Sequence, residues 1–223
     1  MNMKKLFSII FVIFFLLVTT APNITQAAIP VTGSATTLYQ PIGRSDNSLS
    51  QLISQASTLN NANQVAGLFQ YKNMQATVVQ QPAGQPAFVS TDAGQVTQFA
   101  MAEKYGTTAL LAHNYLEGQA FFNIETGNKI ALVFGDGHTQ SYKVTQIKQY
   151  QALNPTSPYS KFVDLDDPAG TTLTSTELFN TIYTVDGRLV LQTCIAKDGQ
   201  SSWGRLFVIA EPVTTLSSTL AMN

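Results

Sequence analysis

Residues 188–212, RLVLQTCIAKDGQSSWGRLFVIAEP, decide the fold that we expect for this chain. Two runs rich in apolar and β-branched residues flank a polar segment, a pattern typical of two neighbouring β-strands. Cys194, the only cysteine, lies at the end of the first run, and Arg205 begins the second. A hairpin-like connection would bring the thiol and the guanidinium together on adjacent strands.

The N-terminus predicts export. Two lysines in residues 1–5 precede an apolar run over residues 6–18, which is too short to span a bilayer comfortably and has the length of a signal-peptide core. Ala27 and Ala28 offer a cleavage site. We therefore predict a signal peptide over residues 1–28 and an extracytoplasmic protein, secreted or at the cell surface. The alternative is an uncleaved membrane anchor, because the apolar run can be extended through Ala21.

The composition excludes several classes of function. Charged residues make up 11% of the chain and the formal net charge is −1, which argues against a nucleic-acid partner. A single cysteine excludes an internal disulfide and a cysteine-rich metal site. In an oxidising compartment the remaining thiol is paired with another molecule, buried and inert, or reactive.

The rest of the chain divides into a polar extension, a strand-rich domain and a tail. Residues 29–75 are polar, with one helix predicted where Leu49, Leu52 and Ala56 recur at helical spacing. Residues 76–213 carry the strand signals, and residues 214–223 form a loose tail. Strands are predicted at 76–81, 86–90, 107–113, 128–134, 139–147, 188–193 and 205–210, and helices at 94–106 and 175–183.

These elements predict a mainly β fold. About seven or eight short strands with inserted helices are typical of a closed or nearly closed β-barrel. Asp136-Gly137 predicts a tight hairpin turn, and Thr174 with Glu177 predicts a capping box at the start of the last helix.

The chain contains two histidines that could assist the thiol. A thiol attacks as thiolate and needs a base or cation beside it and a donor for the oxyanion it creates. His138 lies in the predicted hairpin turn, where a solvated histidine is expected. His113 ends a predicted strand, so it is the candidate base. Alone, His113 would be a core histidine, Cys194 a small buried hydrophobe and Arg205 a surface charge; together they suggest a catalytic site.

Three other residues are candidates for contact with a substrate. Thr193 precedes the nucleophile, and Trp203 and Phe121 could line a groove, although aromatic side chains mostly serve as packing volume. Residues 154–170 form a Pro-rich loop with three aspartates, but their spacing is not that of a dedicated Ca²⁺ loop. We predict solvated carboxylates there, and neither a metal nor a cofactor.

The segment around Cys194 resembles the sortases, bacterial surface cysteine transpeptidases with a T-L-x-T-C strand end and an arginine on the next strand. Residues 191–194, LQTC, match the last four positions, and Val190 stands where the leading threonine is usual. Arg205 in GRLFVIA matches the arginine. LLAHNYLEGQAFF, residues 110–122, is similar to the histidine segment of the family. The order His, Cys, Arg also agrees, and the likeness covers about residues 76–212.

This resemblance implies a sortase-like barrel and a two-step acyl transfer. Cys194 would attack a carbonyl of a sorting peptide in a secreted protein, Arg205 would hold the oxyanion, and His113 would serve as acid and then base. The acceptor would be an amine of cell-wall or pilus type. Alternatives are a hydrolytic cysteine peptidase of the same fold, a non-catalytic surface binding or assembly module, and a secreted barrel with accidental resemblance.

Two other cysteine-dependent classes fit the sequence less well. Papain-like and related cell-wall peptidases place cysteine before histidine, the reverse of this chain. L,D-transpeptidases share the order found here, but their cysteine follows a Ser-x-Gly type segment. Here Gln192 and Thr193 precede Cys194.

Overall fold

The computed structural model describes residues 46–70 and 74–213. The predicted signal peptide (1–28) and the predicted tail (214–223) lie outside these residues. The helices are α2 (Asp46–Ser57), α3 (Ala100–Glu103), α4 (Gly118–Phe121) and α5 (Ser175–Tyr183). The strands are β1 (Asn61–Gln70), β2 (Met74–Gln80), β3 (Gln95–Gln98), β4 (Thr108–Leu111), β5 (Lys129–Gly135), β6 (Thr139–Ala152), β7 (Phe162–Asp164), β8 (Thr172–Leu173), β9 (Leu189–Lys197) and β10 (Gln200–Pro212).

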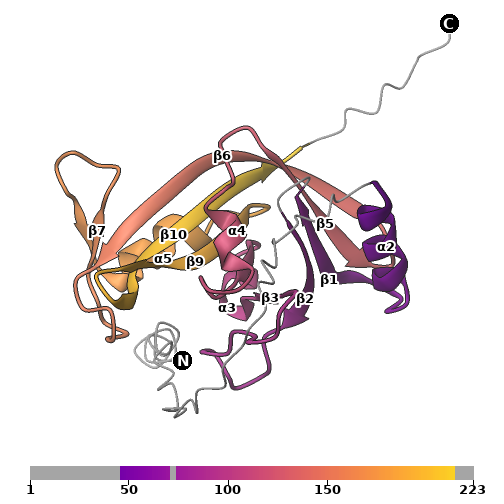
Figure 1. Cartoon of the computed structure of the whole chain (residues 1–223), viewed down its shortest axis with the longest axis horizontal. Coiled ribbons are helices and arrows are strands. Elements are labelled where there is room, and N and C mark those ends of the chain that lie inside the picture. Colours follow the sequence, from indigo (N-terminus) through magenta and orange to yellow (C-terminus); the bar gives the residue numbers. More distant parts are fainter. Residues whose placement is uncertain (1–45, 71–73, 214–223) are drawn as a thin grey trace, which may run out of the picture.

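Eight of these strands close into a barrel, as the sequence predicted. They follow the order β10-β9-β4-β3-β2-β1-β5-β6, and β6 pairs again with β10. The two small strands β7 and β8 continue the sheet beyond β6. Figure 1 shows the long strands β6 and β10 running side by side from the barrel toward β7 and α5.

The barrel interior holds the main apolar core. It is filled from every barrel strand by buried side chains such as Leu68, Val96, Leu132 and Val208. Phe121 and Ile124, from α4 and the residues after it, belong to the same cluster. Burying a side chain of this size contributes about 1.5–3 kcal/mol, so this cluster is a main source of the fold's stability.

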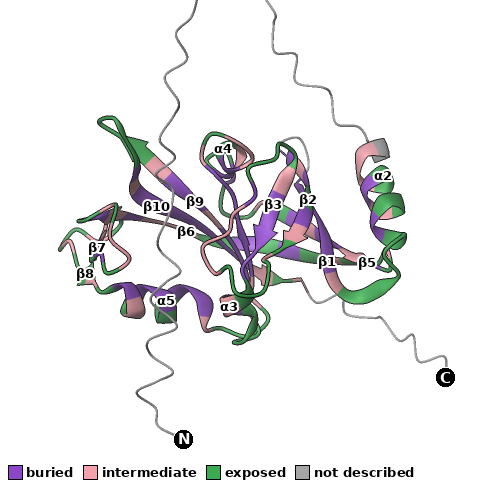
Figure 2. Ribbon diagram, turned by 90° about the horizontal axis from the view of Figure 1, so that it is seen from below, coloured by how far each residue is buried: buried purple, intermediate pink, exposed green. Residues whose placement is uncertain are grey.

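A second apolar layer covers the outer face of β4, β9, β10 and β6. The buried side chains Leu178, Phe179, Ile182 and Tyr183 of α5 pack there with residues of α3 and of the sheet. Figure 2 shows α3 and α5 on one side of the strands and α4 on the other. The predicted capping box is present: the Thr174 hydroxyl accepts from the Glu177 N–H, and the Glu177 carboxylate accepts from the Thr174 N–H.

The N-terminal part of the barrel differs from the prediction. The sequence placed the barrel's start at residue 76, but β1 pairs with both β2 and β5. The predicted helix is present as α2, and it packs Leu52 and Ala56 against Ala66, Phe69 and Val133 of the barrel wall. The sequence did not predict β1 as a barrel strand because its first residues are polar and exposed, and only its second half is buried.

Two predicted elements between β2 and β4 were wrong. The predicted helix over 94–106 is strand β3 followed by the single turn α3, since residues 95–98 pair with β2 on one side and β4 on the other. A short apolar run fits both the helical and the strand periodicity. Here the hydrogen bonds to the two neighbouring strands favour the strand. The predicted strand at 86–90 is a turn region, in which Phe88 donates to the Gln85 carbonyl and Pro86 has no N–H to offer a ladder.

Candidate active site

The β9–β10 hairpin brings Cys194 and Arg205 together. The two strands are connected by Asp198 and Gly199, whose φ angles of 51° and 77° suit a two-residue turn with positive φ at both positions. Lys197 pairs with Gln200 across this turn, and Cys194 pairs with Arg205. The thiol and the guanidinium therefore start from directly opposite positions on neighbouring strands.

An irregularity in β10 sets this register. From the pair Lys197–Gln200, an unbroken ladder would place residue 203 opposite Cys194. Between Gln200 and Gly204 the register shifts, so that β10 carries two extra residues and Arg205 reaches that position. Gly204 is required there, because a Cβ would lie 2.6 Å from the Tyr150 carbonyl oxygen of β6. The bulge thus selects which side chain faces the thiol.

His113 reaches the same place from the other side of β9. Strand β4 runs parallel to β9, with Leu111 opposite Gln192. The pairing continues past the end of β4, since the Ala112 N–H donates to the Gln192 carbonyl. Two residues beyond the pair Leu111–Gln192 lie His113, just past the end of β4, and Cys194, within β9.

All three side chains lie on the outer face of the barrel wall. Side chains alternate along a strand, and Leu111, Val190 and Phe207 belong to the outer cluster, each an even number of residues from its site residue. The row continues beyond Arg205, which pairs with Tyr150 of β6, and Tyr150 pairs with Asp164 of β7. Four consecutive strands therefore present Cys194, Arg205, Tyr150 and Asp164 in one cross-strand row. His113 follows the end of β4, the strand next to β9.

Arg205 is 6% exposed and its head is held by the backbone. Nη1 donates to the carbonyls of Ser202 at 2.9 Å and Gly204 at 2.8 Å. The guanidinium carbon lies 5.9 Å from the centre of the Phe162 ring. Hydrogen bonds from a guanidinium to carbonyls have defined directions, so this charge is fixed beside the bulge of β10.

His113 is 2% exposed, and within the described residues neither ring nitrogen has a hydrogen-bond partner that satisfies normal geometry. Burial lowers its pKa below the ordinary histidine value, and the polar contact with the Val89 backbone raises it, as the smaller of the two effects. The Tyr115 ring stacks on the imidazole, with centroids 4.9 Å apart and planes inclined by 25°. His113 is thus a neutral imidazole under an aromatic cover.

The predicted substrate contacts fall in different places. The Thr193 side chain lies on the other face of β9, where its hydroxyl donates to the Ala112 carbonyl at 2.9 Å. Phe121 is 1% exposed in the barrel core. The structure therefore does not bring Thr193 and Phe121 to the face of Cys194. Trp203 is half-buried in the bulge of β10, with the Lys197 ammonium 4.6 Å above its ring.

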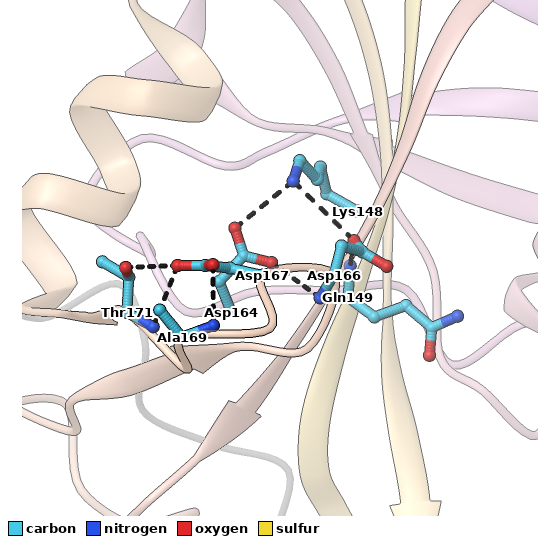
Figure 3. Close-up of polar contacts among 7 residues, drawn as sticks. All are labelled: Lys148, Gln149, Asp164, Asp166, Asp167, Ala169 and Thr171. Carbon is cyan, nitrogen blue, oxygen red and sulfur yellow. Dashed lines mark hydrogen bonds and ion pairs between the residues drawn. The ribbon is translucent and has the colours of Figure 1, made fainter.

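The Pro-rich loop that follows β6 uses its aspartates internally (Figure 3). Lys148 Nζ lies 3.3 Å from Asp164 Oδ2 and 3.9 Å from Asp166 Oδ2. Asp166 also accepts the Gln149 N–H. Tyr150, next in β6, is buried beside these carboxylates, and burial together with their charge raises its pKa to about 12.

Asp167 organises the turn before β8. Its carboxylate accepts the N–H groups of Ala169 and Thr171 and the Thr171 hydroxyl. These bonds, the Thr171 hydroxyl first, lower the pKa of Asp167. Among the residues that the structure describes, no group of three or more His, Cys, Asp or Glu side chains is arranged to hold a metal ion.

Two contacts near the thiol carried no clear signal in the sequence. Tyr115 is one, because an aromatic residue in a turn does not reveal what it stacks on. The other is the hydrogen bond from the Tyr183 hydroxyl to Gln192 Oε1. It connects α5 to β9 two residues before Cys194. Burial raises the pKa of Tyr183, which keeps this hydroxyl a donor.

In this closed barrel a thiol and a guanidinium lie opposite each other on β9 and β10, and an imidazole follows the end of the adjacent strand β4. The family model described as the Sortase domain matches residues 70–213, more than half of the chain. The chain therefore belongs to the sortase family. No curated protein matches the sequence.

Similar solved structures are sortases of several bacteria. Sortase C1 of Streptococcus suis is 12% identical, covers 78% of this chain and 83% of its own, and gives a TM-score of 0.47. Sortase C-1 of Actinomyces oris is 15% identical, with 75% and 99% covered and a TM-score of 0.46. Sortase C of Clostridium perfringens SM101 is 14% identical, with 75% and 89% covered and a TM-score of 0.42. The family assignment depends on the domain match and not on these values.

Proposed function

We propose that this chain is a sortase-type transpeptidase that cleaves a sorting peptide of a secreted protein and transfers it to an amine. The observation that supports this most is the cross-strand row of His113, Cys194 and Arg205 on one face of the barrel. A packing role alone does not require three reactive groups of complementary chemistry at adjacent strand positions.

In the first step, Cys194 Sγ attacks the carbonyl carbon of the peptide. The thiol proton passes to His113 Nδ1 or Nε2, and the carbonyl becomes a tetrahedral oxyanion. When the C–N bond breaks, His113 gives this proton to the leaving amine, and a thioester on Cys194 remains. A neutral imidazole is the form that can accept the proton, in agreement with the lowered pKa of His113.

In the second step, an amine attacks the thioester carbon. His113 removes a proton from the amine, the C–S bond breaks, and the proton returns to the sulfur. The product is a new amide, and the thiol is restored. Attack by water instead of the amine would release an acid, which is the reaction of a hydrolytic peptidase of the same fold.

Arg205 is proposed to stabilise the oxyanion in both steps. Its head is oriented beforehand by the carbonyls of Ser202 and Gly204. A donor fixed before the reaction stabilises developing charge without reorganising. The cation therefore belongs to the catalytic group in this proposal, with Cys194 as nucleophile and His113 as acid and base.

A second candidate function is a non-catalytic surface binding or assembly module. Cys194 is 5% exposed, which is also the environment of an inert core thiol. In either function we place the chain outside the cytoplasm, secreted or at the cell surface, with substrates or partners among secreted proteins. Within the described residues, no helix is long and apolar enough to span a membrane.

The test is capture of the thioester from a degenerate peptide library. Intact protein mass should increase by an acyl fragment of a library peptide, and hydroxylamine should release that fragment as a hydroxamate. Cys194→Ala should form no adduct. Formation of the same products by Cys194→Ala at the native rate would remove Cys194 from the mechanism, and a native protein that never acquires an adduct would favour the binding module.

A further inference from the structure

Tyr115 is exposed at the surface, whereas His113, on which its ring stacks, is buried. It lies two residues after His113 in the turn that follows β4, and its side chain is 52% exposed, whereas His113 is 2% exposed. The two rings are stacked with centroids 4.9 Å apart. The tyrosine ring therefore lies between the imidazole and the solvent and covers one face of it.

The imidazole has no hydrogen bond of normal geometry within the described residues. A histidine that transfers protons is ordinarily held by such a bond at one ring nitrogen, which also selects its tautomer. The Val89 backbone is a polar neighbour of the ring and raises its pKa, in opposition to burial. Packing against Tyr115 adds a second constraint on the ring, since stacked aromatic rings have a preferred geometry.

The turn that carries Tyr115 is firmly held. The N–H groups of Leu116 and Gly118 both donate to the His113 carbonyl, at 3.0 and 3.1 Å. Asn114 Nδ2 donates to the Ser201 carbonyl of the β10 bulge at 3.0 Å. Gly118 permits the close approach, because a Cβ there would lie 2.6 Å from the His113 carbonyl oxygen. Tyr115 is therefore placed on the imidazole by the backbone on both sides of it.

We propose that Tyr115 is a positioning residue that orients His113 by stacking and excludes water from it during proton transfer. This inference depends on the proposed function, because it needs the acid and base role of His113. Removal of the ring leaves His113 mobile and hydrated.

The first test follows the titration of His113 by NMR in the full-length protein, which needs no substrate. Tyr115→Ala should raise the pKa of His113 toward the ordinary value, because burial is the main cause of its present lowering. Tyr115→Phe should leave it unchanged. Tyr105→Ala is the matched control. Tyr105 is 41% exposed, and its ring packs against the Phe179 ring, with centroids 5.7 Å apart.

The second test measures turnover of a peptide obtained from the library. Tyr115→Ala should lower kcat by about tenfold, the scale on which a misplaced proton-transfer group acts, with little change in KM, while Tyr115→Phe and Tyr105→Ala stay near native. An unchanged His113 titration in Tyr115→Ala overturns the inference. A Tyr115→Ala protein with an altered His113 titration but native turnover also overturns it. If the proposed function fails, no variant turns over, but the titration still reports whether Tyr115 covers His113.

Discussion

At the scale of single residues, the burial of His113 links protonation to folding. Its pKa is lowered in the folded state, mainly by burial, so the unfolded chain takes up a proton more readily. The stabilisation is fully present above the ordinary histidine pKa and is lost as the pH falls from that value toward the folded one. A neutral, buried base thus makes the fold sensitive to mild acid.

His113→Gln should remove this dependence. Urea unfolding at about pH 7.5 and about pH 5.5, which bracket the ordinary titration of histidine, should show a larger loss of unfolding free energy in the native protein than in the variant. His138 is present in both proteins, so the difference isolates His113. Equal pH dependence in the two proteins would contradict the burial of a neutral imidazole.

Arg205→Lys should lower kcat/KM by about 100-fold, the usual loss when an oxyanion donor is removed. Nη1 is occupied by the carbonyls of Ser202 and Gly204, and an ammonium has no second nitrogen in a fixed plane that could donate to the oxyanion at the same time. Arg188→Lys is the control, since Arg188 Nε bonds Glu211 at 3.1 Å at the other end of the hairpin and should tolerate the exchange. Near-native turnover of Arg205→Lys would exclude Arg205 from the mechanism.

At the scale of the elements, the bulge of β10 decides which residue faces the thiol. Gly204→Ala would place a methyl group 2.6 Å from the Tyr150 carbonyl oxygen. We expect a loss of about 1–3 kcal/mol in unfolding free energy, as for other overpacked positions, and reduced turnover because Arg205 is displaced. Ser201→Ala, an exposed change in the same bulge, should have neither effect. A Gly204→Ala protein of native stability would show that the strands do not approach as described.

Thr193 connects the two segments that end in His113 and Cys194. Thr193→Val keeps the shape but removes the hydroxyl that donates to the Ala112 carbonyl. A buried acceptor left without its donor costs about 1–3 kcal/mol, which urea unfolding should detect. Thr181→Val, at an exposed position of α5, is the control. If the two variants were equally stable, this bond would not hold the strand ends together.

The sequence predicted the elements whose signals are local. The hairpin around Cys194, the capping box at Thr174 and the barrel class follow from turn residues, side-chain patterns and strand count. The β10 bulge could not be predicted, because its register depends on the approach of β6 to Gly204. Phe121 remained a candidate for either a groove or the core, because spacing does not reveal whether an aromatic side chain points into the barrel or out of it.

At the scale of the whole molecule, barrel closure assembles the site. Cys194 and His113 are brought together by the parallel pairing of β4 with β9, across a long sequence separation, and β6 completes the row when it pairs with β10. The three reactive groups are therefore neighbours only in the folded barrel. If the three groups act together, any enhanced reactivity of Cys194 must disappear when the chain unfolds.

The rate at which iodoacetamide modifies Cys194 tests this claim most directly. In the native protein we expect labelling at least about tenfold faster than in the urea-unfolded chain, since an adjacent base can take up the thiol proton during attack. This excess rate should be lost in His113→Gln and Arg205→Lys. A thiol that reacts only after unfolding, or at the same rate in all three proteins, would contradict the account.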